Sequence, residues 1–143
     1  MNTASGTTGG VRLVLRLEGA LILAVSLILY QRLFGSWEIF ALCFLLPDVS
    51  FAGYLLGPSI GALSYNSAHS YIGPLLCAGV GLTTGSHPLL LATLIWSAHI
   101  GFDRALGYGL KYSEGFGFTH LGRIGREAGL IPTASGESPP VLR

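Results

Sequence analysis

The sequence predicts an all-α membrane protein with four transmembrane helices in a small bundle, and three observations support this. Half of the 143 residues are hydrophobic and only 10% are charged, whereas an ordinary soluble domain has roughly 25% charged residues. The few charged residues are absent from long stretches of the chain, so lipid rather than water is expected to solvate the apolar surface. Turn residues divide these stretches into pieces of about 20 residues, the length of helix that crosses a bilayer.

The four spans are predicted at residues 11–33, 37–56, 59–82 and 88–108. A Gly/Ser/Thr-rich stretch, residues 1–10, precedes them and is interpreted as a disordered arm. Trp37 begins the second span as an interfacial anchor. Pro47 lies inside that span, and because proline has no N–H to donate, a kink is expected there. Gly57 separates the second and third spans, and Pro88 suits the first turn of the fourth.

The distribution of positive charge predicts the orientation in the membrane. Residues 109–143 follow the last span and are interpreted as a cytoplasmic, glycine-rich loop and tail. Four spans place both ends of the chain on one side, where seven of the eight Lys and Arg residues lie, Arg32 being the exception. Because short loops rich in Lys and Arg stay in the cytoplasm, both termini are expected there. The chain is thus expected to be a multi-pass protein of the cell (inner) membrane.

The lipid bilayer is therefore the expected partner of this chain. A net charge of +1 without a basic stripe gives no reason to expect nucleic acid. The sequence identifies no protein partner, and a homo-oligomer is one of the arrangements that it allows. Cys43 and Cys77 lie in apolar runs and are expected to be buried small hydrophobic residues.

Ionisable residues inside the predicted spans mark a candidate functional site, because each costs about 2.5–3.5 kcal/mol to insert. Glu18, Asp48, His69 and His99 come from four different helices. At 1.5 Å per residue, they lie roughly 10–15 Å from the cytoplasmic ends of those helices. One such group per helix at a common depth predicts a shared site in the bundle core, where metal sites of helical bundles are built.

Oxygen and nitrogen donors of this kind suit a divalent metal ion such as zinc, manganese or iron. In this interpretation His69 and His99 are metal ligands. Asp48 and Glu18 are further ligands or the catalytic base. The metal would activate a water molecule, and the chain would be a hydrolase-like enzyme acting on a lipid-phase substrate.

Other polar residues are expected to support this site. Asp103 lies four residues after His99, on the same helix face, and can orient its imidazole ring. Asn66 and Tyr65 precede His69 by three and four residues and share its face in the same way. His120, after the last span, can fold back to the cytoplasmic mouth of the site, although an exposed loop histidine is the simpler interpretation.

Two alternatives to an enzyme stay open, since the spacing contains no fixed metal motif such as HExxH. Polar residues in membrane helices often hydrogen-bond from helix to helix and serve packing alone. The chain would then be a non-enzymatic accessory or assembly subunit. Chains of Asp, Glu and His are also typical of proton or ion pathways.

Three stretches carry a resemblance to a known family: RLEGALIL, LLPDVSFAGYLLGPSIGALSYNSAHSY and WSAHIGFDRALGYGLKYSEGFGFTHLGRIG. Over roughly residues 12–125 the chain resembles the bacterial membrane proteins called domain of unknown function 4260. The resemblance implies a small polytopic membrane protein with no assigned activity. The motif residues correspond here to Glu18, Asp48, Tyr65, Asn66, His69, His99, Asp103, Arg104, Lys111, Thr119 and His120.

Overall fold

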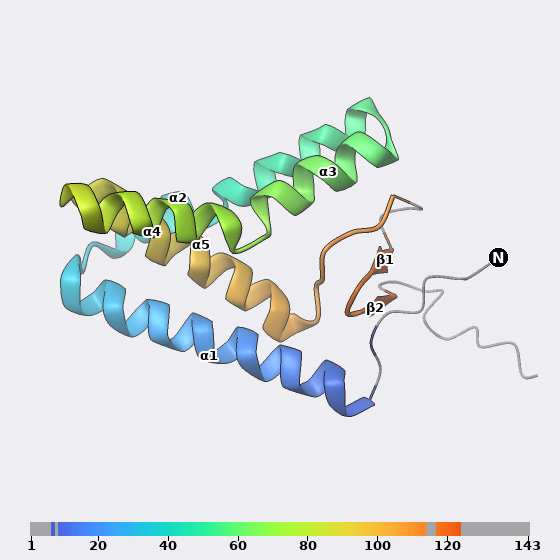
Figure 1. Cartoon of the computed structure of the whole chain (residues 1–143), viewed down its shortest axis with the longest axis horizontal. Helices are drawn as coiled ribbons and strands as arrows, with labels where there is room; N and C mark the ends of the chain where they lie inside the picture. The colour runs from blue at the N-terminus through green and yellow to red at the C-terminus, as the bar shows by residue number, and fades with distance from the viewer. Residues whose placement is uncertain (1–6, 8, 114–116, 124–143) are drawn as a thin grey trace, which may run out of the picture.

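The computed structural model describes Thr7, residues 9–113 and residues 117–123, and it is built of helices with two short strands near residue 120 (Figure 1). In chain order the elements are α1 (Gly9–Leu33), α2 (Trp37–Phe44), the 3₁₀ helix η1 (Leu46–Leu56), α3 (Pro58–Ala68), α4 (Ile72–Thr84), α5 (His87–Leu106), β1 (Phe118–Thr119) and β2 (Gly122–Arg123). The prediction of a helical fold is confirmed. Most of the predicted arm at residues 1–10 and the tail after residue 123 lie outside the described residues.

Three segments are long and apolar enough to cross a membrane: Gly9–Leu33, Trp37–Leu56 and His87–Leu106. They agree with the first, second and fourth predicted spans to within two residues at each end. Large apolar side chains cover their outer surfaces, and Leu55 is 88% exposed. Apolar surface of this extent is typical of proteins that lie in lipid rather than in water.

The third predicted span, residues 59–82, is broken in its middle, which corrects the expectation of one continuous helix. α3 ends at Ala68 and α4 begins at Ile72. Pro74 is tolerated in the first turn of α4, but deep inside a longer helix it would clash with the carbonyl group four residues earlier. The helix therefore restarts just before Pro74, and His69 lies in the gap as the C-cap of α3.

The second span is also discontinuous, because α2 ends at Phe44 and the chain continues as η1. Pro47 lies in the first turn of η1, so the kink expected there takes the form of a change of helix type. An 11-residue 3₁₀ helix is unusually long, since such helices rarely exceed 3–4 residues and often mark functional positions. Asp48 thus lies in the first helical turn after one break, and His69 lies in the other.

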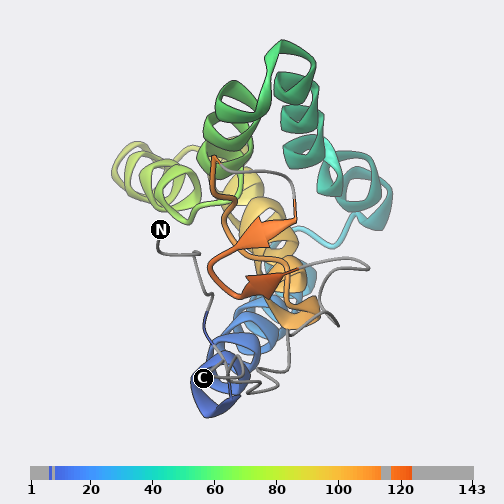
Figure 2. The ribbon, with the colours of Figure 1, turned by 90° about the vertical axis from the view of Figure 1, so that its right-hand side faces the viewer.

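Glycine residues bring α1 and α5 together as an antiparallel pair (Figure 1). A Cβ atom on Gly101 would lie 2.7 Å from the carbonyl oxygen of Gly19, so neither position has room for a side chain. On the other side, α4 packs on α5 and η1 packs on α3. In Figures 1 and 2, η1 and α3 lean away from α1 at the end of the bundle where the strands lie.

The segment after α5 fills the space between these diverging helices (Figure 2). Asn66 holds it through two hydrogen bonds with the backbone of Lys111: the side-chain amide donates to the carbonyl (2.8 Å), and the side-chain oxygen accepts from the N–H (2.7 Å). Leu121 and Thr119 are buried. Residues 109–113 and 117–123 of the predicted loop are therefore packed against the helices.

Candidate metal centre

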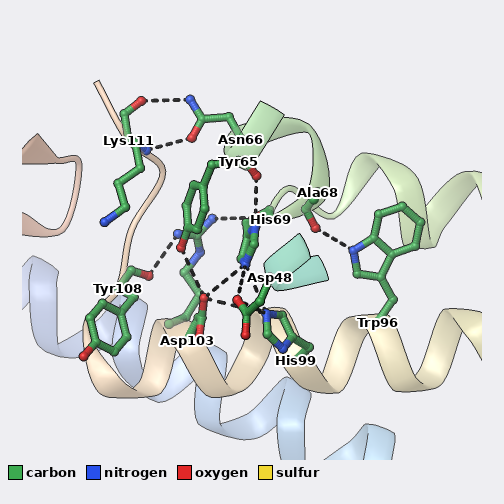
Figure 3. A network of polar contacts seen from close by, with 11 residues as sticks. Asp48, Tyr65, Asn66, Ala68, His69, Trp96, His99, Asp103, Tyr108 and Lys111 are labelled. Carbon is green, nitrogen blue, oxygen red and sulfur yellow. Dashed lines mark hydrogen bonds and ion pairs between the residues drawn. The ribbon is translucent and has the colours of Figure 1, made fainter. Parts of the chain in front are cut away.

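Four polar side chains from η1, the break between α3 and α4, and α5 meet inside the bundle (Figure 3). Asp48 comes from the first turn of η1, and His69 from the C-cap of α3. His99 and Asp103 come from successive turns of α5. Both histidines are almost fully buried, whereas the Asp48 side chain is 37% exposed. Asp48 therefore lies on the open side of the cluster.

The four side chains point their nitrogen and oxygen atoms at one place. Nε2 of His69 lies 3.1 Å from Nε2 of His99. Oδ1 of Asp48 lies 3.3 Å from the His69 nitrogen and 3.5 Å from the His99 nitrogen. Oδ2 of Asp103 is farther away, 3.6 Å from Nε2 of His69 and 3.9 Å from Nε2 of His99. Within the described part of the chain, Asp48, His69 and His99 form the group whose ligand atoms are mutually close enough to share a metal ion.

The backbone and ring of Tyr65 determine how His69 faces this place. Nδ1 of His69 lies 3.0 Å from the Tyr65 carbonyl oxygen. Because a carbonyl oxygen only accepts hydrogen bonds, Nδ1 carries the hydrogen, and the neutral ring presents the lone pair of Nε2 to the cluster. The Tyr65 ring also stacks on the imidazole, with centroids 3.8 Å apart. Metal-binding histidines usually donate their second N–H in this way, so His69 is arranged as an Nε2 ligand.

Asp103 does not orient His99 in the expected manner. Its carboxylate faces Nε2 of His99 rather than Nδ1, and it lies closer to His69 than to His99. The Nδ1 atom of His99 is buried without a hydrogen bond to any described residue. The ring is positioned instead by an edge-to-face contact with Phe44, at a centroid distance of 5.2 Å. Asp103 accepts a hydrogen bond of 3.2 Å from the Tyr65 hydroxyl group.

The cluster contains more hydrogen-bond acceptors than donors. Ionised Asp48 and Asp103 only accept, and Nε2 of neutral His69 also accepts. A cation at the centre would bind Asp48 and Nε2 of His69 directly and would balance the charge of Asp103. A tetrahedral ion with bonds of about 2.0–2.1 Å holds its ligand atoms about 3.3–3.4 Å apart. The distances among Asp48, His69 and His99, from 3.1 to 3.5 Å, agree with that spacing, so these three residues fit a metal ion.

The structure does not bring Glu18 to this cluster. Glu18 lies on the exposed side of α1 and borders a small cavity of about 120 Å³ together with Tyr71, Arg104 and His120. Its neighbour Gly19 is the residue that packs against α5, so the rotation of α1 turns the Glu18 carboxylate away from the histidines. His120 does fold back onto the bundle, but its Nδ1 accepts from the Leu110 N–H (2.8 Å) rather than joining the cluster.

The other two expected supporting residues differ in their roles. Tyr65 contacts both His69 and Asp103 and thus supports the cluster directly. Asn66 binds the backbone of Lys111 instead, so it holds the C-terminal segment over the site.

Two residues that sequence reasoning did not place at the site tie the α3–α4 break to α5. Arg104 donates to the carbonyl of His69 (3.1 Å) and to that of Tyr108 (3.2 Å). The indole N–H of Trp96 donates to the carbonyl of Ala68 (2.6 Å). A signal was available, because Arg and Trp inside an apolar helix need acceptors for their N–H groups. Both also lie within five residues of His99 in the sequence.

Lys111 is a further residue near the site that the sequence did not predict to be buried. It is only 4% exposed, and its Nζ lies 5.3 Å from the centre of the Tyr65 ring, a cation–π distance. Burial lowers the pKa of this amine. Lys111 thus places positive charge on the face of Tyr65 opposite His69, as Figure 3 shows.

Comparison with known families gives a match over residues 12–124, to the family described as Domain of unknown function (DUF4260). The chain belongs to this family. Domain of unknown function 4260 thus extends from the first turns of α1 to β2 and includes every residue of the cluster. No curated protein and no solved structure matches the chain significantly. Because the description of domain of unknown function 4260 assigns no activity, the function has to be argued from the cluster.

Proposed function

We propose that this protein is an integral membrane enzyme with four membrane crossings, which binds a divalent metal ion at Asp48, His69 and His99. The metal would serve to hydrolyse a lipid-phase substrate. The observation that carries the proposal is the set of three distances among these ligand atoms, 3.1, 3.3 and 3.5 Å. They agree with the edges of a tetrahedron around one ion.

The charges of the cluster support the same proposal. Two carboxylates in a membrane interior are costly unless they are protonated or paired with positive charge. A divalent ion balances the charges of Asp48 and Asp103, whereas the two histidines are neutral in the form that binds metals. The ion thus offsets the cost of burying the site.

The longer distances to Asp103 suggest its role. Three protein ligands leave a fourth tetrahedral position for water, as in catalytic zinc sites, and a bound ion lowers the pKa of such a water to about 7. Asp103 lies beside the two histidine nitrogens without being needed as a ligand, and Tyr65 holds its carboxylate. We assign Asp103, in place of Asp48 and Glu18, as the general base that accepts the proton of the water.

One observation favours a second function. The separation of 3.1 Å between the two histidine nitrogens is also a hydrogen-bond distance, and Asp48 is partly exposed. A proton shared among these groups would make the cluster a structural network or a proton pathway in a non-enzymatic membrane subunit. Metal content separates the two functions.

The test is elemental analysis of the full chain, purified in detergent, exposed in turn to zinc, manganese and iron(II), and desalted. We expect about one ion per chain for the preferred metal, and loss of most of it in His69→Ala and in His99→Ala. His87→Ala is the matched control, because His87 lies at the opposite end of α5 and contacts Phe34.

The control variant should retain the metal content of the parent protein. Absence of stoichiometric metal across the whole panel would contradict the proposal. So would equal retention of metal by the three histidine variants, since binding would then lie elsewhere in the chain.

A further inference from the structure

An apolar cavity of about 360 Å³ opens beside the proposed metal site. Its wall includes Cys43, Pro47, Ala68, Ala92, Ile95 and Trp96. Two of these residues directly precede ligands in the chain, and Ile95 lies one helical turn before His99. The volume falls within the range of about 300–1,000 Å³ that is usual for small-molecule sites. The cavity and the cluster therefore adjoin each other.

The wall of the cavity suits hydrocarbon rather than a polar group. The indole N–H of Trp96 is the strongest donor there, and it is already bonded to the Ala68 carbonyl at 2.6 Å. That bond satisfies both groups. A polar headgroup placed in this cavity would therefore lose its hydrogen bonds to water without replacement, whereas a hydrocarbon chain would lose none.

The cavity lies deeper in the predicted membrane than the cluster does. In the same way, the hydrocarbon chain of a lipid in the cytoplasmic leaflet lies deeper than its polar group. His99 lies seven residues from the cytoplasmic end of α5, or about 10 Å at 1.5 Å per residue. Trp96 lies midway between His87 and Leu106, and thus near the centre of the bilayer in a four-span arrangement. The polar group of such a lipid lies toward the cytoplasmic face and its chain ends near the bilayer centre.

We infer that the cavity binds the hydrocarbon chain of a single-chain amphiphile, whose polar group then lies at the metal cluster. This inference rests on the proposed function and defines its substrate class. Occupation of the cavity would hold the bond to be hydrolysed beside the cluster, because Pro47 and Ala68 belong to the cavity wall and lead directly into Asp48 and His69.

Trp96 supplies the readout for a test, since bromine atoms on a chain that contacts it quench its fluorescence. The chain has two tryptophans, so Trp37→Phe leaves Trp96 as the only emitter. We would reconstitute the 143-residue chain in nanodiscs of unbrominated phospholipid and titrate in a dibrominated fatty acid. The inference predicts quenching that saturates at a low mole fraction of the probe.

Ala92→Phe should fill the cavity and remove the saturable quenching. Ala24→Phe adds the same volume on the exposed side of α1 and should leave it unchanged. Cys43→Phe, from another part of the wall, repeats the test if the first variant does not fold. Quenching that rises only in proportion to the probe, or that is equal in Ala92→Phe and Ala24→Phe, would overturn the inference.

The metal content of the same samples separates this inference from the proposed function. The cavity residues contribute no ligand atom to the cluster, so Ala92→Phe should keep its metal. Stoichiometric metal without saturable quenching contradicts the cavity inference alone. Saturable quenching without metal contradicts the proposed enzyme and with it the assignment of the amphiphile as a substrate.

Discussion

Tyr65 contacts three residues of the candidate site: His69, Asp103 and Lys111. Its carbonyl accepts from Nδ1 of His69, its ring stacks on that imidazole, and its hydroxyl group donates to Asp103. The Nζ of Lys111 lies over the same ring. Three of these contacts depend on the ring or the backbone, and only the bond to Asp103 depends on the hydroxyl group.

Tyr65→Phe therefore isolates that hydrogen bond. We expect the stacking on His69 to persist. We expect the affinity for metal to fall about 10–100-fold, because the Asp103 carboxylate is then no longer held beside the ligand nitrogens, where its charge attracts the ion. Competition between the protein and a chelator of known affinity measures this change. Tyr112→Phe is the matched control, because Tyr112 is exposed. Equal affinities of the two variants would show that the hydroxyl group of Tyr65 does not support the site.

At the scale of elements, residues 107–113 and 117–123 are held over the site by a small number of bonds. Asn66 anchors one part through Lys111. His120 anchors another, because its Nδ1 accepts from the Leu110 N–H and its carbonyl accepts from Thr7. Burial and the nearby Arg104 lower the pKa of His120, and Glu18 borders the same small cavity.

This arrangement predicts that acid loosens the segment. A protonated His120 cannot accept the Leu110 N–H, so the folded chain favours the neutral ring. Because the folded pKa lies below the ordinary value of about 6.5, the contribution to stability is complete above that value. It is lost as the pH falls from there through the lowered pKa of the folded chain. We expect faster proteolysis after Lys111 at pH 5.5 than at pH 7.5, relative to an unstructured peptide standard.

His120→Asn is the control for this prediction. Its side-chain oxygen offers an acceptor at nearly the same place and does not titrate in this range. The variant should lose the part of the pH dependence that arises from His120, while any part that arises from the buried cluster remains. An identical pH dependence in parent and variant would contradict the assigned role.

At the scale of the whole molecule, the arrangement of the elements favours an even number of membrane crossings. The turns after α1 and after α4 lie at one end of the bundle, and the turn between η1 and α3 and the end of α5 lie at the other (Figure 1). α3 and α4 are each too short to cross a bilayer alone, with 11 and 13 residues, since about 20 are needed. Together they return the chain to the end where the turn after α1 lies.

Cysteine labelling from outside intact cells tests this topology. In a chain with Cys43→Ser and Cys77→Ser, an impermeant thiol reagent should label Ser36→Cys and Ser86→Cys. It should label Ser113→Cys only after permeabilisation, because positively charged segments stay in the cytoplasm. Labelling of position 36 but not of position 86 would contradict the four-crossing arrangement, since the broken third span would then not reach the outer face.

The sequence by itself determined the helical class of this protein, three of its apolar spans and the residue types of the cluster. These features depend on local properties: hydropathy over about 20 residues, the missing N–H of proline, and the cost of a polar side chain in lipid. Pro47 and its expected kink belong to the same group. The break at His69 had a comparable local signal in Pro74, but the sequence analysis expected a continuous helix there.

Only the tertiary structure decided which carboxylates join the histidines. Glu18 and Asp48 were expected together because position along a helix determines depth in the membrane. The direction of a side chain depends instead on the rotation of its helix, and the contact between Gly19 and Gly101 determines that rotation for α1. It turns Glu18 away, whereas α5 presents His99 and Asp103 on one face. The cavity beside the cluster has the same origin, because it exists only where α2, η1, the end of α3 and α5 meet.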